Sequence, residues 1–382
     1  MNQKSMLRFV CTVFLAATLT VACGWLRNSG SNPTTPTTKV EVIKVGAIIP
    51  LTGPAAYLGE GERLGMQLAL ENYPDMKSKV NFIFEDSQGK PENAVTSVRK
   101  LLDFENVGIH AVSTTGAVLA TLPAYKQSGK DVLVFAQSMM PELTKGYPFA
   151  YRIYATADEE MKLLAEYSKQ QKYLRVGTLN ATNRAGDEAA KILQRKVGEY
   201  GGTVEISESV PSTEKDFRNI LGKFKEKNLD AIMIYAFTTG YPTILQQMEE
   251  VGLKIPILGN LQFAVGGFDQ KISPDVLRRV VFPASRYYIA KDDPKIKEFD
   301  QKVKAAGKEA NHDIAYFYDM TNILIKAIQT SPSKSPKDIG ASMLKLMPYE
   351  GVTGTIQLNA DRDNQATMTL VKRTDNGIKI LN

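Results

Sequence analysis

Residues 44–59 read KVGAIIPLTGPAAYLG. The apolar stretch 45–49 predicts a short buried strand, which Pro50, Gly53 and Pro54 end abruptly. In an open parallel sheet, ligands bind beyond the carboxyl ends of the strands. Residues 52–58 are therefore expected to form one wall of a ligand site, with an ordinary strand-to-helix connection as the alternative.

Strand and helix patterns alternate through the rest of the chain. Strands are predicted at residues 80–85, 109–112, 132–135, 175–179, 203–210, 231–235, 255–258 and 280–289, with two more after residue 353. Helices are predicted at 61–71, 91–106, 117–127, 157–171, 187–200, 217–227, 241–251, 294–306, 312–330 and 339–347. Such alternation predicts parallel sheets covered by helices. Because the pattern of the first 150 residues starts again near residue 157, we expect two α/β units in tandem.

The composition is that of a soluble protein with a substantial core. The chain has 382 residues, of which 43% are hydrophobic and 23% charged, enough for two domains of ordinary size. The formal net charge is +6, and Lys and Arg are interspersed with Asp and Glu. Basic arms and interleaved aromatic and basic residues are not found, so nucleic acid is not an expected partner.

The N-terminus has the features of a bacterial lipoprotein signal. Lys4 and Arg8 precede an apolar run at 9–21, which is too short to span a bilayer comfortably. Small residues then precede Cys23, although Thr20 stands where such signals usually carry Leu. We expect residues 1–22 to be removed and Cys23 to be acylated, with a plain signal peptide as the alternative.

The region after Cys23 is expected to be a tether. Residues 23–39 are rich in Ser, Thr, Asn, Pro and Gly and cannot bury a core. The only other cysteine is Cys11, inside the predicted leader, so the mature chain would hold no disulfide. Loss of Lys4 and Arg8 would lower the formal charge from +6 to +4.

Six segments in this order resemble the substrate-binding lipoproteins of the branched-chain amino acid type of ABC transporters. They are KVGAIIPLTGPAAYLGEG, EDSQGKPENAV, MMPELTKGYPFAYRIYATADE, DFRNILGKFKEKNLDAIMI, LQQMEEVGL and YEGVTGTIQLNADRDN. The resemblance implies a type I periplasmic binding protein with two Rossmann-like α/β lobes, whose parallel sheets are joined by a three-stranded hinge. It implies that the lobes close around a ligand.

The resemblance also implies the limits of each lobe. Lobe 1 would comprise residues 40–154 plus 285–350, and lobe 2 residues 155–284 plus 351–382. The three crossovers would lie near residues 151–154, 284–288 and 349–353.

The family holds an amino acid's carboxylate at a helix N-terminus in the first lobe. The matching segment here, STTGAVLATLPAY, makes Thr115 and Gly116 the expected carboxylate contacts, with help from the helix dipole. The alternative is that Ser113 or Thr114 simply caps the helix, a bond of about 1 kcal/mol that needs no ligand.

The resemblance points to further contacts in two loops but also shows departures from the family. After the next strand stand Gln137, Ser138 and Met139, and Met139 replaces the Thr that the family uses. The loop that carries the family's ammonium-binding carboxylate contains Leu261 and Gln262 here and has no acid. A buried ammonium without a partner would be costly. Asp313 could replace that acid, or could be a helix N-terminal acid favoured by the dipole.

Apolar contacts are expected from Leu58, Tyr57 and Phe237, which match walls of the family's site. Ala185 stands where amino-acid binders often have Tyr, and the adjacent Arg184 could meet an anion or be a solvated surface charge. We expect a small ligand that is either amino acid-like or mostly apolar with one carboxylate or amide.

Catalytic and cofactor motifs are not found. His110 and His312 have no metal-binding spacing, and the sequence has no nucleophile elbow and no phosphate-binding loop. We therefore expect no enzyme activity and no cofactor. The predicted function is a monomeric, lipid-anchored solute receptor on the bacterial cell envelope that delivers its ligand to ABC permease subunits. The alternatives are a ligand-sensing subunit of the same fold for a signalling partner and an exported α/β hydrolase.

Overall fold

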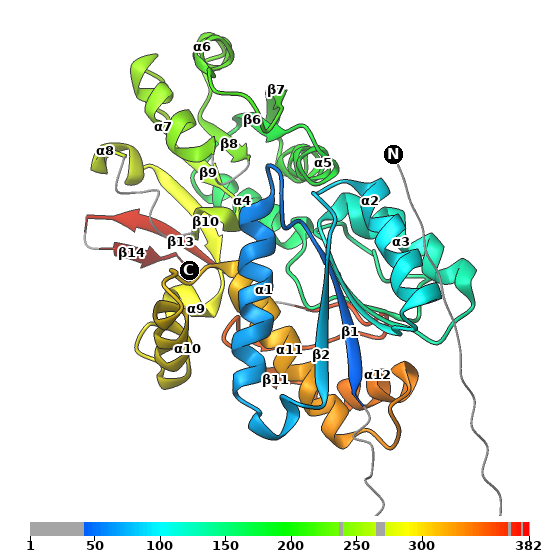
Figure 1. Cartoon of the computed structure of the whole chain (residues 1–382). Helices are drawn as coiled ribbons and strands as arrows, with labels where there is room; N and C mark the ends of the chain where they lie inside the picture. Colours follow the sequence, from blue (N-terminus) through cyan, green and yellow to red (C-terminus); the bar gives the residue numbers. More distant parts are fainter. Residues whose placement is uncertain (1–41, 237–239, 265–271, 366–367, 376, 382) are drawn as a thin grey trace, which may run out of the picture. The chain divides into compact units, whose positions relative to one another are not determined.

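The computed structural model describes residues 42–236, 240–264, 272–365, 368–375 and 377–381 (Figure 1). These residues belong to one compact unit, Glu41–Asn382. The predicted leader, Cys23 and the tether lie outside the described residues. Among the helices of the described ranges, none is both long and apolar enough to cross a membrane.

The first sheet has five parallel strands in the order β2-β1-β3-β4-β5. They are β1 (Ile43–Ile49), β2 (Val80–Asp86), β3 (Ile109–Ser113), β4 (Leu133–Gln137) and β5 (Ala150–Tyr151). The register aligns Ile49 with Asp86 and Ser113 with Gln137, so these strands end at one edge of the sheet.

Both faces of the first sheet are covered, because alternate residues of its buried strands point to opposite sides. Val45, Ala47 and Ile49 of β1 join one apolar cluster, whereas Ile48 joins another. The covering helices are α1 (Ala56–Glu71), α2 (Pro91–Arg99), its π-helical continuation η2 (Lys100–Phe104), α3 (Thr115–Ser128), α11 (His312–Thr330) and α12 (Pro336–Lys345).

Helix α1 packs along α11 on one face of this sheet (Figure 1). The contact is close, because a side chain at Gly65 would collide with the backbone carbonyl of Ile314. Late residues of the chain therefore complete the core around the first sheet.

The second sheet has seven strands in the order β14-β13-β10-β9-β8-β6-β7. They are β6 (Arg175–Ala181), β7 (Thr203–Val210), β8 (Ala231–Tyr235), β9 (Ile257–Gly259), β10 (Val280–Ala284), β13 (Thr369–Thr374) and β14 (Gly377–Ile380). Strands β6 to β10 are parallel, and β13 and β14 are added antiparallel at one edge.

The second sheet is also covered on both faces. Helices α4 (Ala157–Gln170) and α5 (Arg184–Gly198) pack on one face, and α6 (Arg218–Glu226) and α7 (Tyr241–Glu250) on the other. The remaining elements are η1 (Pro74–Met76), η4 (Leu261–Ala264), α8 (Pro274–Leu277), α9 (Arg286–Ile289), α10 (Pro294–Ala305) and the pair β11 (Tyr349–Glu350) and β12 (Thr355–Ile356).

One predicted element is wrong in part. The strand predicted at residues 280–289 ends at Ala284, and the short helix α9 follows. The backbone N–H of Arg286 donates to the Thr353 carbonyl at 3.2 Å, and its guanidinium pairs with Asp293. These contacts turn the chain away from the sheet. Helix α1 also begins earlier than predicted, at Ala56 rather than near Gly61.

Arg152 connects distant parts of the chain immediately after β5. Its side chain is 0% exposed and forms an ion pair with Asp363, in which Nε donates to Oδ1 at 2.6 Å. Its Nη1 donates to the backbone carbonyls of Ser138 and Met140. Arg152 therefore makes structural hydrogen bonds and holds the segment that follows β4.

Candidate ligand-binding site

A cavity of about 420 Å³ lies at the carboxyl ends of strands from both sheets. Small-molecule sites are usually mostly apolar clefts of about 300–1,000 Å³ with a few polar groups. The residues that line this cavity are Ala55, Tyr57, Leu58, Gly89, Pro91, Thr114, Thr115, Gly116, Gln137, Met139, Tyr154, Ala181, Asn183, Arg184, Ala185, Tyr235, Ala236, Asn260 and Gln262.

The opening loop of the chain forms one wall of the cavity, and Asp86 at the end of β2 fixes that loop. The Asp86 carboxylate accepts hydrogen bonds from the backbone N–H groups of Leu51 at 2.9 Å and Thr52 at 3.2 Å, and from the Thr52 hydroxyl at 2.6 Å. Partial burial raises the pKa of Asp86, but these bonds and that from Gln88 outweigh it, so the net pKa is lowered. Tyr57 and Leu58 then extend along the cavity.

The start of α3 forms the polar end of the same wall. Its N-cap residue Thr114 has a positive φ of 75°, and its side chain makes no capping hydrogen bond. The Ser113 hydroxyl instead donates to Glu62. The alternative interpretation, in which Ser113 or Thr114 caps the helix with its side chain, is therefore not realised in the structure.

Thr115 is the first residue of α3 and is 7% exposed. Its Oγ1 accepts hydrogen bonds from the Ser138 hydroxyl and from the Met139 backbone N–H, both at 3.3 Å. Since Oγ1 accepts these bonds, the hydroxyl hydrogen of Thr115 can still be donated. Gly116 follows on the cavity surface, so the two residues predicted as carboxylate contacts lie side by side there.

The segment after β4 supplies Gln137 and Met139 to the cavity, whereas Ser138 lies behind Thr115 and is buried. The Met139 carbonyl accepts a hydrogen bond from the Ala157 N–H at 2.9 Å, and its sulfur accepts one from the Tyr235 hydroxyl. Met139 thus contacts the end of β8 from the side of β4.

The second sheet places Gln262 on the cavity but not Leu261, which is buried in an apolar cluster with Met161. Phe237 lies outside the described residues. At the start of α5, the Asn183 side chain caps the helix by accepting from Gly186 N–H at 2.8 Å, and Arg184 and Ala185 line the cavity.

Arg184 is the one charged residue among the described side chains that line the cavity. It is exposed and forms no ion pair with another described residue. Asp313 is buried in the first turn of α11 and is not part of the lining. The described wall therefore has one cation and no carboxylate.

Metal or histidine chemistry finds no support in the described ranges. No group of three His, Cys, Asp or Glu residues there could hold a metal ion. His110 is buried in β3 and lies 2.8 Å from the Val107 carbonyl and 2.7 Å from the Tyr125 hydroxyl. Burial lowers its pKa to about 4, although the Val107 bond acts in the opposite direction. His110 is a core residue.

Three polar contributors were not predicted, namely Tyr154, Tyr235 and Asn260. Tyr235 is the last residue of β8, and Asn260 directly follows β9. The position at a carboxyl strand end was a usable signal for both. Tyr154 follows β5, whose two residues are too short for a sequence pattern.

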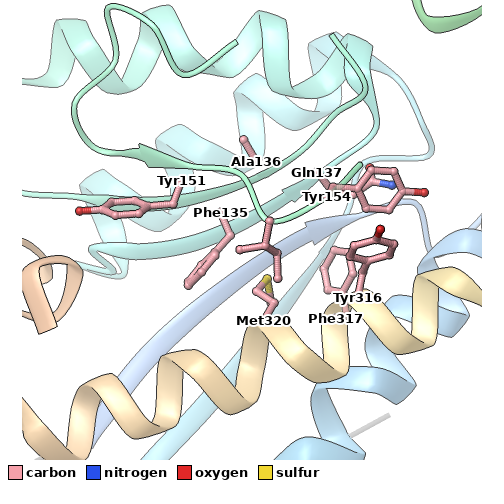
Figure 2. Close-up of a pocket in the computed structure, with 9 residues that line it drawn as sticks. Phe135, Ala136, Gln137, Tyr151, Tyr154, Tyr316, Phe317 and Met320 are labelled. Carbon is pink, nitrogen blue, oxygen red and sulfur yellow. The ribbon is translucent and has the colours of Figure 1, made fainter. Parts of the chain in front are cut away.

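Gln137 and Tyr154 also border a hole of about 10 Å³ (Figure 2). Figure 2 shows these two residues at one end of the group and Tyr151 at the other, with Phe317 and Met320 of α11 on the side opposite β4. The hole is about one water probe in size. It is a gap in the core packing and not a second ligand site.

Two α/β lobes with mainly parallel sheets, and a ligand-sized cavity at their carboxyl edges, define a solute-binding protein of the periplasmic type. The family model described as periplasmic binding protein matches residues 42–377. The chain therefore belongs to the periplasmic binding protein family, which confirms the resemblance found in the sequence.

Relatives and solved structures agree with this family. The chain is 21% identical over 334 residues to the leucine-, isoleucine-, valine-, threonine- and alanine-binding protein of Pseudomonas aeruginosa, covering 85% of this chain and 87% of the relative.

Among solved structures, one similar fold is an ABC transporter solute-binding protein from Rhodopseudomonas palustris in complex with 3,4-dihydroxybenzoic acid. Its TM-score is 0.79 at 21% identity, with 88% of this chain and 95% of that chain covered. Another is the branched-chain amino acid binding protein LivJ of Streptococcus pneumoniae in complex with isoleucine, with a TM-score of 0.77 at 21% identity and coverage of 89% and 99%. The predicted two-lobed α/β fold is confirmed.

Proposed function

We propose that this protein is the solute receptor of an ABC importer and that it captures an organic acid with an apolar or aromatic body. The observation that carries the proposal is the lining of the cavity, in which the N-terminus of α3 and Arg184 at the start of α5 can meet an anion and no described carboxylate is present. A carboxylate at a helix N-terminus is stabilised by free N–H groups and by the helix dipole.

The contacts proposed for the carboxylate are the Thr115 hydroxyl and the backbone of Gly116. The remaining walls would hold the body of the ligand with Leu58, Met139 and Tyr235, while Gln137 and Gln262 offer amide groups. Phe237 stays a proposed aromatic contact. Ser138 and Leu261 would act from behind the wall, because both are buried.

The residues that line the cavity suit an amino acid less well than a carboxylic acid that has no ammonium group. An α-ammonium taken out of water needs a charged or well-placed polar partner, and desolvating it without one is costly. The two similar structures differ in this respect, since one holds 3,4-dihydroxybenzoic acid and the other isoleucine. The described lining favours the first kind of ligand.

The proposal has three further parts. The protein delivers its ligand to ABC permease subunits, it is anchored through acylated Cys23, and it acts as a monomer without enzyme activity. Closure of the two lobes about crossovers near residues 151–154, 284–288 and 349–353 would hide the ligand from water. A sensory role in the same fold remains a second possibility on family grounds, but no observation in the cavity favours it.

A thermal-shift screen of purified protein tests the proposal. A ligand present at 100 times its dissociation constant stabilises the folded state by about 2.7 kcal/mol, which such a screen detects. We expect 3-phenylpropanoate and 3,4-dihydroxybenzoate to raise the melting temperature more than phenylalanine or isoleucine does. Stabilisation by none of these compounds would contradict the proposed ligand class.

The Thr115→Ala variant tests whether the Thr115 hydroxyl contacts the ligand. The variant should bind the stabilising acid roughly tenfold more weakly, since a hydrogen bond to a charged group contributes about 1.5–3 kcal/mol. Thr121→Ala in the same helix is the matched control, because Thr121 is buried and does not line the cavity. Unchanged affinity in Thr115→Ala would remove this residue from the site.

A further inference from the structure

Two buried carboxyl groups lie where the second turn of α1 meets the first turn of α11. Glu62 is 0% exposed and Asp313 is 1% exposed. The helix backbones approach closely there, since a Cβ added at Gly61 would lie 3.4 Å from the Asp313 Cβ. Among the described residues, no Lys or Arg forms an ion pair with either carboxyl.

In each of these two carboxyl groups, one buried oxygen atom has no hydrogen-bond partner among the described residues. Glu62 Oε1 accepts from the Ser113 hydroxyl, while Glu62 Oε2 has no hydrogen-bond partner among the described residues. Asp313 Oδ1 lies 3.0 Å from Nε2 of His312, but outside hydrogen-bond geometry, and it also lacks a described partner. Buried unsatisfied polar atoms are rare and call for an explanation.

A proton on Glu62 Oε2 supplies that explanation. The protonated oxygen becomes a donor, and Asp313 Oδ1 is an acceptor without a partner. Burial, followed by the charge of Asp313, raises the pKa of Glu62 well above its ordinary value, while the bond from Ser113 lowers it. Two carboxyl groups in one buried site do not both ionise readily.

We propose that Glu62 and Asp313 share one proton, and that loss of this proton at alkaline pH weakens the binding of an anionic ligand in the cavity. The inference rests on the proposed function as an organic-acid receptor. The shared proton itself does not depend on which ligand the cavity takes.

Three cavity residues connect the pair to the ligand. Gln137 lies 3.4 Å from the Ser113 hydroxyl that bonds Glu62. His312 Nε2 lies 3.1 Å from the Gln262 amide nitrogen, and the His312 ring packs edge-on against Tyr154 at a centroid distance of 6.2 Å. The pair therefore lies one layer behind the cavity wall, and a second negative charge there would repel a bound carboxylate.

The other titratable groups around the pair come from three elements. Tyr154 follows β5, Tyr287 lies in α9, and His312 precedes Asp313 in α11. Burial, followed by the charge of Asp313, raises the pKa of both tyrosines well above their ordinary value, so they stay neutral between pH 6 and about pH 9.

The test measures the affinity for 3-phenylpropanoate by calorimetry between pH 6 and about pH 9, a range in which this carboxylate stays ionised. Wild type should bind roughly tenfold more weakly at the alkaline end, and Glu62→Gln should bind like wild type at pH 6 with no such fall. Glu60→Gln is the matched control, because Glu60 is exposed in the same helix and pairs with Lys308. A flat wild-type profile, or the same fall in Glu62→Gln, would overturn the coupling.

An infrared measurement without ligand tests the shared proton separately. The difference spectrum between wild type and Glu62→Gln at neutral pH should contain the carbonyl band of a protonated carboxyl group, and Asp313→Asn provides a second variant if the first does not fold. Absence of this band overturns the proposal. If 3-phenylpropanoate does not bind at any pH, the proposed ligand class and the coupling to it both fail, while the band still decides whether a carboxyl group of the pair holds a proton.

Discussion

The backbone N–H of Thr114 donates a hydrogen bond to Oε1 of Gln137 at 2.8 Å. Thr114 has a φ of 75°, a conformation that is costly for a β-branched residue. The parallel register, in which Ser113 is aligned with Gln137, brings the two residues together. The end of β4 therefore stabilises the turn that begins α3, and both residues line the cavity.

Gln137→Ala should lower both stability and affinity. The substitution removes the acceptor of the Thr114 N–H, and loss of this part-buried hydrogen bond should cost about 0.5–1.5 kcal/mol. Urea unfolding measures the loss, and calorimetry measures the affinity for the acid that the thermal-shift screen identifies. Gln301→Ala, at an exposed position in α10, should change stability by no more than about 0.5 kcal/mol. Equal stability of the two variants would show that the Thr114–Gln137 bond contributes little.

Glu159→Gln should change how stability depends on pH. Glu159 and Thr156 form the capping box of α4, which Gln can retain. Burial raises the pKa of Glu159 from 4.5 to about 7, against the bonds from Thr156 and the charge of Arg152, and with a smaller contribution from Asp363. Between these two pH values the folded state holds a proton that the unfolded state releases, so the free energy of unfolding falls as the pH rises.

The Glu159→Gln variant has no carboxyl group at this position and therefore cannot release this proton. Its stability should equal that of wild type near pH 4.5 and exceed it above pH 7, because the fall occurs between the two pKa values. Urea unfolding across this range measures the difference. Glu166→Gln, an exposed position in the same helix, should follow the wild-type curve throughout. A constant difference between Glu159→Gln and wild type at all pH values would rule out titration of Glu159 as its cause.

Arg152→Met should be strongly destabilising. It leaves Asp363 buried without its cation and frees the carbonyls of Ser138 and Met140. Removing one partner of a buried ion pair typically costs 3–5 kcal/mol. The double variant Arg152→Met with Asp363→Leu should recover part of this loss, because it removes the unpaired charge.

The control for Arg152→Met is Lys162→Met, which breaks an exposed pair with Glu166 and should cost less than about 1 kcal/mol. Chemical denaturation measures all three variants. If Arg152→Met were no more destabilising than Lys162→Met, the buried pair would not hold the cavity wall.

The fold was readable from the sequence because helical and strand periods alternate over long, well-marked segments. The limits of β8 and α11, for example, were predicted as the structure has them. The strand predicted to run to residue 289 failed after Ala284, because a contact with Thr353, distant in sequence, turns the chain there. Local patterns cannot show such a contact.

The cavity was predictable where it follows strand ends and a helix start, as with Leu58, Thr115, Gly116 and Gln137. The direction in which each side chain points was harder to predict from the sequence. Ser138 and Leu261 neighbour cavity residues but point into buried surroundings, and their sequence gave no sign of this. The contact of Glu62 with Ser113 and its burial beside α11 are likewise not visible in the local sequence pattern.

The central claim is that the cavity selects a carboxylate without an α-ammonium. Calorimetric titration with two matched pairs, 4-methylpentanoate against leucine and 3-phenylpropanoate against phenylalanine, tests it most directly, because the members of each pair differ only in the ammonium group. The account predicts tighter binding of the acid that lacks the ammonium in at least one pair, and tighter binding of the amino acid in neither. Tighter binding of leucine or phenylalanine than of its matched acid would contradict it.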